Sequence, residues 1–250
     1  MNVGMTRELH NDLLAVNEVF KSSIQPWWND VLVYHEQVEK EETFALLPAL
    51  TLAVFDYMGH KREVALVIAS IVKLFYFNNR IVETVKDDEE GQVQDQNLQF
   101  SILIGDYVLG SILKLLVENE VDSLLKLFSD MMAQVNQGLV EKYKLSMSCQ
   151  EIIMKSRIPI YQTAFLAAAR LGEVDPQEEA RLKQMGLHVG MAVELLREGN
   201  LQEEARLHIH GAEALLKQMG KCNETHGSSL AIILRGLHEI LCSVDQAAAI

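Results

Sequence analysis

Two groups of side chains are of types that bind metal ions, and their spacing shows whether they could do so. One is the run of four carboxylates Asp87-Asp88-Glu89-Glu90, and the other is the pair His208 and His210. Consecutive like charges usually mark an exposed segment, so we favour a surface loop over a cation site for the acidic run. Residues two apart on a helix point about 200° away from each other, which prevents the two histidines from binding one ion together.

The cysteines and glycines give no sign of catalytic chemistry either. Cys149, Cys222 and Cys242 lack the spacing of a zinc site, and an odd number does not suit a framework of disulfides. Free thiols favour a reducing compartment, so we expect a cytoplasmic protein. No glycine-rich phosphate loop follows a strand pattern, and no serine or cysteine nucleophile signature occurs. The spacing of these residues alone indicates no catalytic set.

The composition is that of a globular chain with an acidic surface. Hydrophobic residues make up 49% of the 250, and 22 Lys and Arg against 35 Asp and Glu give a net charge of −13. Nucleic acids and anionic membranes attract positive surfaces, so we expect neither as a partner. Charges within the first eight residues predict no signal peptide. The longest uncharged apolar stretch, Phe44–Phe55, is shorter than the roughly 20 residues that cross a bilayer, which predicts a buried helix and no transmembrane segment.

Helical periodicity runs along nearly the whole sequence, and strand patterns are almost absent. Apolar residues recur at three- and four-residue steps over 64–75, 102–116 and 121–132, and again over 147–172, 176–198, 200–219 and 226–243. Asp175-Pro176 has the form of a helix start, and Gly199-Asn200 that of a stop. We therefore predict an all-α fold of about nine or ten helices, in one domain that spans residues 1–250.

Five segments resemble, in the same order, motifs of the trans-polyprenyl diphosphate synthases. They are Gly59-His60-Lys61-Arg62 for G-G-K-R, Phe100–Gly110 for the helix A-V-L-A-G-D-Y-L-L, Lys155-Ser156 for a K-T pair that opens a long helix, Ala169–Gly172 for the end of that helix, and Gly186–Ala192 for G-x-x-x-G-x-A. The resemblance covers about residues 45–240 and implies an isoprenoid-synthase-like bundle around a central cavity.

The resemblance fails at the two aspartate-rich motifs that this family uses for catalysis. In the family, these carboxylates hold the magnesium ions that neutralise the departing diphosphate of an allylic substrate. Counting back from Gly105 places the three aspartates of the first motif at Val82, Glu83 and Lys86, and the second motif falls on Arg197 and Glu198. A valine, a lysine and an arginine cannot ligate a dication, so we expect neither a metal site nor catalysis by this chain alone.

A retained G-D-Y helix beside two eroded motifs is similar to the small, non-catalytic subunit of two-component bacterial hexaprenyl and heptaprenyl diphosphate synthases. The resemblance implies a regulatory subunit without a cofactor, which pairs with a catalytic synthase and supports the synthesis of long-chain product. Only that partner would bind magnesium. Three cations remain at family motifs: Lys61, Arg62 and Lys155. They are either vestiges of diphosphate binding or helix caps and surface ion pairs, and we favour the second interpretation.

One helix is expected to lie at the subunit interface, as the matching helix does in dimers of the family. It carries Gly105, Asp106, Tyr107, Gly110 and Ser111. Apolar residues spread around nearly the whole of 98–116, and one bundle usually covers only part of such a helix. We therefore predict a heterodimer with a catalytic homologue or a homodimer, and expect Tyr107 and Ser111 to point outward. The alternative is that the glycines let this helix pack inside its own bundle.

Two other functions stay open at this point. One is a stand-alone binding protein that holds an isoprenoid or another apolar ligand in the family cavity without turnover. The other, less favoured, is an active prenyltransferase with an unusual metal site.

Overall fold

The computed structural model describes residues 7–84, 96–199, 201–219 and 228–248, and all the regular structure within these ranges is helical. The helices are α1 (Arg7–Ser23), α2 (Trp28–Val38), α3 (Glu42–Tyr57), α4 (Arg62–Thr84), α5 (Gln96–Glu118), a short 3-10 helix (Asp122–Leu124), α6 (Leu125–Lys144), α7 (Cys149–Ser156), α8 (Ile158–Leu171), α9 (Pro176–Glu198), α10 (Gln202–Gln218) and α11 (Ser229–Ala248). The all-α fold is confirmed.

The described α-helices exceed the expected number because one periodic run is divided. The run over 147–172 breaks at Arg157, whose φ of −118° and ψ of −44° separate α7 from α8. Pro159 follows in the first turn of α8, where a residue without an N–H leaves no helical hydrogen bond unmade. Apolar periodicity continues across this break, so it does not reveal the division.

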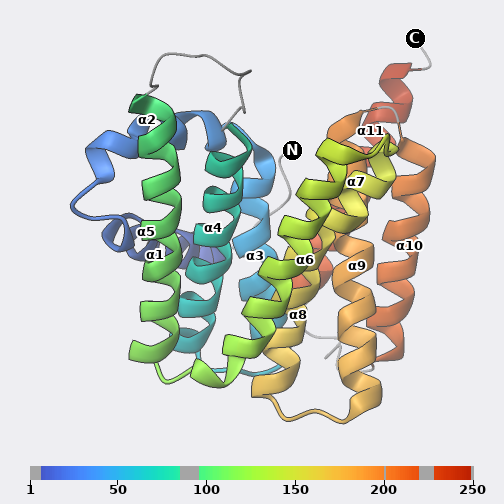
Figure 1. Cartoon of the computed structure of the whole chain (residues 1–250). Coiled ribbons are helices and arrows are strands. Elements are labelled where there is room, and N and C mark those ends of the chain that lie inside the picture. Colours follow the sequence, from blue (N-terminus) through green and yellow to red (C-terminus); the bar gives the residue numbers. More distant parts are fainter. Residues whose placement is uncertain (1–6, 85–95, 200, 220–227, 249–250) are drawn as a thin grey trace.

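The long helices form a bundle in which α3 and α8 are the central elements. Figure 1 shows α3, α4 and α5 on one side, and α6, α8, α9 and α10 on the other. Twelve residues of α3, between Thr43 and Phe55, are buried, and so are eleven residues of α8. The apolar stretch Phe44–Phe55 is thus a core helix, as its length predicts.

Two glycines set the distance between α8 and α9. A Cβ atom on Gly186 would lie 3.0 Å from the Cα of Gln162, and one on Gly190 would lie 2.7 Å from the Cγ of Tyr161. Side chains cannot be accommodated at these distances, so glycine is required for the close approach of the two helices. This contact also brings the Tyr161 ring to the last turns of α9.

The space between α4 and α6 is small. A cavity of about 30 Å³ lies there, and its lining residues are Phe75, Asn78, Asn79, Val82, Met132, Val135 and Asn136. Ligand pockets generally measure about 300–1,000 Å³. This part of the interior therefore has no room for an isoprenoid chain.

Two described helices are long and apolar enough to span a membrane, judged by length and composition only. The segment Arg62–Glu83 of α4 is 72% buried inside the bundle, whereas Gln99–Glu118 of α5 is 33% buried. The first is accordingly a core helix of this fold. The second leaves much of its apolar surface uncovered.

Candidate functional site: an arginine–glutamate cluster

The ends of α4 and α9 meet the starts of α3 and α8 at one end of the bundle, the upper end in Figure 1. This is where the sequence places the second eroded motif and, near it, the first. The charged and phenolic side chains gathered here are called the arginine–glutamate cluster. Its members are Glu41, Tyr76, Arg80, Glu83, Arg157, Glu194, Arg197 and Glu198.

Glu194 is the buried centre of the cluster, with a fully inaccessible side chain. The Tyr161 hydroxyl donates to its Oε1 at 2.8 Å, and Nη1 of Arg157 donates to its Oε2 at 2.9 Å. The Nε atom of Arg197 lies 3.8 Å from the same Oε2. A buried carboxylate needs such partners, because removing an ion from water costs on the order of several kcal/mol. Burial and the charge of Glu194 together raise the pKa of Tyr161 well above its usual value, so this hydroxyl stays a donor.

Glu41 forms a second centre just before α3 begins. Its Oε2 accepts hydrogen bonds from the Tyr76 hydroxyl at 2.5 Å and from Nη1 of Arg197 at 3.2 Å. Its Oε1 accepts from Nε of Arg80 at 2.9 Å. Arg197 therefore joins Glu41 to Glu194, and the end of α9 is tied to the start of α3 and the end of α4.

The positive and negative charges of the cluster balance once one further lysine is included. Arg80 also donates to Glu83, and Nζ of Lys142 on α6 lies 3.6 Å from the other oxygen of that carboxylate. Burial alone would lower the pKa of Arg80, but the charges of Glu83 and Glu41 outweigh it and raise the pKa. Three arginines and Lys142 thus face four glutamates.

This arrangement does not fit the magnesium ions of the family. Magnesium binds hard oxygen donors in a near-octahedral shell. Here Glu41, Glu194 and Glu198 each accept from a guanidinium group, and Glu83 is held by both Arg80 and Lys142. The cations occupy the positions from which metal ions would have to neutralise the carboxylates.

Three of the five motif residues singled out from the sequence lie in the cluster: Glu83, Arg197 and Glu198. Val82 does not, because it lies two residues from Arg80 and so points about 200° away from it. Val82 is 42% exposed and faces Gly105 of α5. Lys86 lies outside the described residues, as does the acidic run 87–90.

A second set of residues with the spacing of the first motif lies three positions earlier on α4. Asn79, Arg80 and Glu83 have the same spacing as the three aspartates of D-D-x-x-D, and two of them contact the cluster. The placement of the motif at Val82, Glu83 and Lys86, counted back from Gly105, stays a prediction.

Five further cluster residues were not identified from the sequence as site residues: Glu194, and also Glu41, Tyr76, Arg80 and Arg157. Their contacts join segments far apart in the chain, which no local spacing reveals. Glu194 is different, since a lone carboxylate inside the apolar run Met191–Leu196 is a local signal for a buried, partnered charge.

Lys61 and Arg62 lie at the opposite end of α4 from the cluster. At 1.5 Å per residue, the 18 residues from Arg62 to Arg80 span about 27 Å. Nε of Arg62 donates to Asp12 at 2.6 Å, and Lys61 is exposed. Nζ of Lys155 donates to Glu141 at 2.5 Å on the surface. Arg62 and Lys155 therefore form ion pairs, and it is Arg157 that reaches the cluster.

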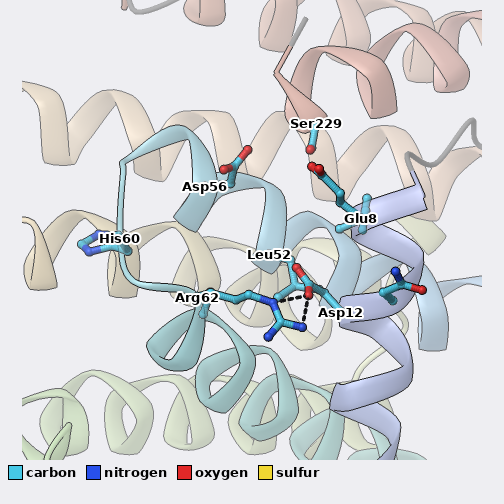
Figure 2. Close-up of a pocket in the computed structure, with 10 residues that line it drawn as sticks. Glu8, Asp12, Leu52, Asp56, His60, Arg62 and Ser229 are labelled. Atoms are coloured by element: carbon cyan, nitrogen blue, oxygen red, sulfur yellow. Dashed lines mark hydrogen bonds and ion pairs between the residues drawn. The ribbon is translucent and has the colours of Figure 1, made fainter. Parts of the chain in front are cut away.

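Arg62 lines a hollow of about 350 Å³ between α1, α3, α4 and the start of α11, shown in Figure 2. Its walls carry three carboxylates: Glu8, Asp12 and Asp56. Burial, followed by the charges of Glu8 and Asp12, raises the pKa of Asp56. A diphosphate would meet these negative charges, so the hollow does not suit the family substrate.

The outer side of α5 is uncovered and largely apolar, with the exposed Asp106 as a charged residue within it. Leu103 is 67% exposed and Val117 is 59% exposed, and Ile102 and Leu113 are exposed too. Gly110 lies within this surface, and a Cβ atom there would meet nothing within 4 Å. We call Gly110 and these four apolar residues the α5 outer face.

Some residues of the G-D-Y helix pack inside the bundle, and others are exposed, as an interface would require. Gly105 packs inside the bundle, since its Cβ would lie 3.3 Å from Oδ1 of Asn78 on α4. Gly110 and Asp106 face outward. Tyr107 and Ser111 do not point outward as expected, because their hydroxyls donate to the carbonyl oxygens of Gln25, just after α1, and Ser23, at its end.

No protein-family model and no curated protein matches the sequence. Solved structures do match over nearly the whole chain. A polyprenyl synthase from Caulobacter crescentus, complexed with calcium and isoprenyl diphosphate, has a TM-score of 0.74 at 17% identity and covers 95% of this chain and 97% of its own. The chain has the isoprenoid-synthase fold.

Two more structures of this fold bear on the site. A geranyltranstransferase from Thermotoga maritima has a TM-score of 0.71 at 16% identity, over 96% of this chain and 100% of its own. The geranyl diphosphate synthase small subunit from Antirrhinum majus has a TM-score of 0.61 at 15% identity, over 94% of this chain and 100% of its own. Similarity at this level of identity establishes the fold and leaves the activity to be argued from the site.

Proposed function

We propose that this chain is a non-catalytic subunit of a heteromeric polyprenyl diphosphate synthase, in which a catalytic homologue binds the substrates and magnesium. The observation that carries the proposal is the arginine–glutamate cluster. Ionising an allylic diphosphate requires cations that contact the leaving group. Here the cations contact glutamates of the same chain, and the cluster offers a diphosphate no metal ligand set.

The α5 outer face supports association with another protein. Monomeric soluble proteins seldom expose several large apolar side chains together along one helix. Gly110, at the centre of this surface, has no side chain, so the backbone of a partner helix can come close there. A catalytic homologue with the same fold would present a helix of matching length, and a second copy of this chain is the other possible occupant.

A stand-alone isoprenoid-binding protein is less well supported. The cavity between α4 and α6 measures about 30 Å³, and the larger hollow near Arg62 is lined by carboxylates. Neither space is both large and apolar, as a pocket for a hydrocarbon chain must be. An active prenyltransferase is disfavoured because the cluster does not fit magnesium.

The test is a reconstitution assay with an intact trans-polyprenyl diphosphate synthase from the same organism. We expect the isolated chain to form no product from an allylic diphosphate and isopentenyl diphosphate with magnesium. We expect the mixture to yield longer prenyl products than the synthase alone, and the two chains to co-elute. Magnesium-dependent product from the isolated chain, or a mixture that behaves as the synthase alone, would refute the proposal.

A further inference from the structure

Three side chains on α10 and α11 lie close enough to share one metal ion, far in sequence from most of the arginine–glutamate cluster. They are His210 and Glu213 of α10 and His238 of α11. One donor atom from each lies within 4.8 Å of the donor atoms of the other two. No spacing within the sequence reveals this group, because 25 residues separate Glu213 from His238.

The positions follow from the packing of the two helices. Residues three apart on a helix share a face, so His210 and Glu213 both project from the side of α10 that packs against α11. Nδ1 of His238 lies 3.6 Å from Oε1 of Glu213. The two imidazole rings are neighbours, with centroids 5.8 Å apart.

We propose that these three residues form a binding site for a divalent transition metal ion, with zinc as the best match. Two imidazole nitrogens and one carboxylate oxygen are a donor set of zinc sites that keep a fourth position open. Magnesium is disfavoured because it prefers oxygen donors throughout. The site is independent of the proposed subunit role.

The distances require only a small closure. With zinc–ligand bonds of about 2.0–2.1 Å, neighbouring donors of a tetrahedral site lie about 3.3 Å apart. The Glu213–His238 pair is already near this value, and the widest pair has to close by roughly 1.5 Å, which side-chain rotation allows. The side chains of His238 and Glu213 are 38% and 33% exposed, so an ion can enter from solvent and keep a water ligand. A bound ion would clip α11 to α10.

A second pair of histidines, His208 of α10 and His188 of α9, forms no such site. His208 faces α9, where its Nδ1 lies 3.1 Å from Nδ1 of His188. Burial lowers the pKa of both rings, so one neutral ring donates to the other. Neither ring belongs to a described group of three donors. The two-residue spacing thus turns His208 and His210 to different helices, as the sequence predicts, and only His210 joins a ligand set.

The experiment is calorimetric titration of the full-length, chelator-treated protein with zinc chloride, repeated with magnesium chloride. We expect one zinc site per chain and no comparable magnesium binding. Replacing His238 or His210 with alanine, or Glu213→Gln, should weaken zinc binding by more than about tenfold. Zinc should raise the melting temperature of the wild type but not of these variants, and circular dichroism would show that they remain helical.

Two controls separate this site from other zinc ligands. His10→Ala removes an exposed histidine on α1, and replacing all three cysteines with serine removes the thiols; both proteins should bind zinc as the wild type does. A wild type that takes up no zinc, or a His238→Ala variant that binds it equally well, would overturn the proposal. Loss of binding in the cysteine-free protein would assign the zinc to thiols and overturn it as well.

Discussion

The arginine–glutamate cluster and the α5 outer face differ in where their side chains find partners. In the cluster, each guanidinium group contacts a glutamate of the same chain, and Glu194 is fully buried among its donors. On the outer face, large apolar side chains such as Leu103 and Val117 are more than half exposed. The first region is complete within one chain, whereas the second is a surface that another molecule would have to cover.

The largest expected effect comes from removing the centre of the cluster. Glu194→Ala leaves Arg157 and Arg197 without their buried counter-charge, and breaking a buried pair in this way costs about 3–5 kcal/mol. Urea denaturation followed by circular dichroism measures the loss. Glu198→Ala is the matched control, since that side chain is 32% exposed and its ion pair with Arg157 lies near the surface, and it should cost about 1 kcal/mol or less. Equal losses of unfolding free energy in the two variants would show that Glu194 contributes no more to the cluster than Glu198 does.

The outer face should give the converse result. Leu103→Lys should weaken association about 10- to 100-fold, because a charge would replace the most exposed apolar side chain of the contact surface. The stability of the folded chain should change by no more than about 0.5 kcal/mol, since this position is 67% exposed. Analytical ultracentrifugation with the catalytic synthase, and without it, measures the association.

The control for this variant is Leu207→Lys on α10, where the leucine is 69% exposed. It should leave association unchanged. Unaltered association of the Leu103→Lys protein would place the interface elsewhere, and a protein that unfolds would mean that α5 belongs to the core of its own bundle.

A charge exchange tests whether arginines stand in for metal ions. The double variant Arg80→Asp with Arg197→Asp adds two carboxylates to the cluster and removes two of its cations. Repulsion between the carboxylates should destabilise the chain. Magnesium should then restore part of the stability, about 1.4 kcal/mol at ten times its dissociation constant, and have no such effect on the wild type. Differential scanning calorimetry with and without magnesium makes the comparison. Equal magnesium responses of the two proteins would contradict this interpretation.

The smallest effect is expected at Lys155, one of the three cations that remain at family motifs. Its ion pair with Glu141 is exposed to solvent, and such pairs contribute little. Lys155→Met should therefore change neither the denaturation midpoint nor the product length in the reconstitution assay. A marked drop in product formation would assign the lysine a role in diphosphate binding.

The sequence is sufficient to predict the fold, and less so to predict the site. Apolar periodicity places most helices, because burial on one side of a helix imposes that pattern. It misses the break at Arg157, since the residues on both sides of that break are buried in the same core. The predicted second motif lies on the same helix as Gly186 and Gly190, so a short count along one helix is enough to place Arg197 at the end of α9.

The remaining site residues depend on contacts that the sequence does not encode locally. Glu41 and Arg197 are 156 positions apart, yet they form one ion pair. Tyr107 and Ser111 turn inward because the end of α1 and the residues just after it offer carbonyl acceptors. Periodicity identifies α5 as apolar on many sides, but only the packing shows which side stays open.

Arg197 also changes how this end of the bundle responds to its surroundings. A metal ion that bridges carboxylates is subject to mass action, so chelators or a fall in the free ion concentration remove it. A guanidinium group that is covalently part of the chain has no free concentration, and its occupancy is fixed once the helix folds. The end of the bundle that holds the cluster is therefore insensitive to the supply of divalent ions, and in the proposed heteromeric synthase a magnesium dependence would report on the partner subunit.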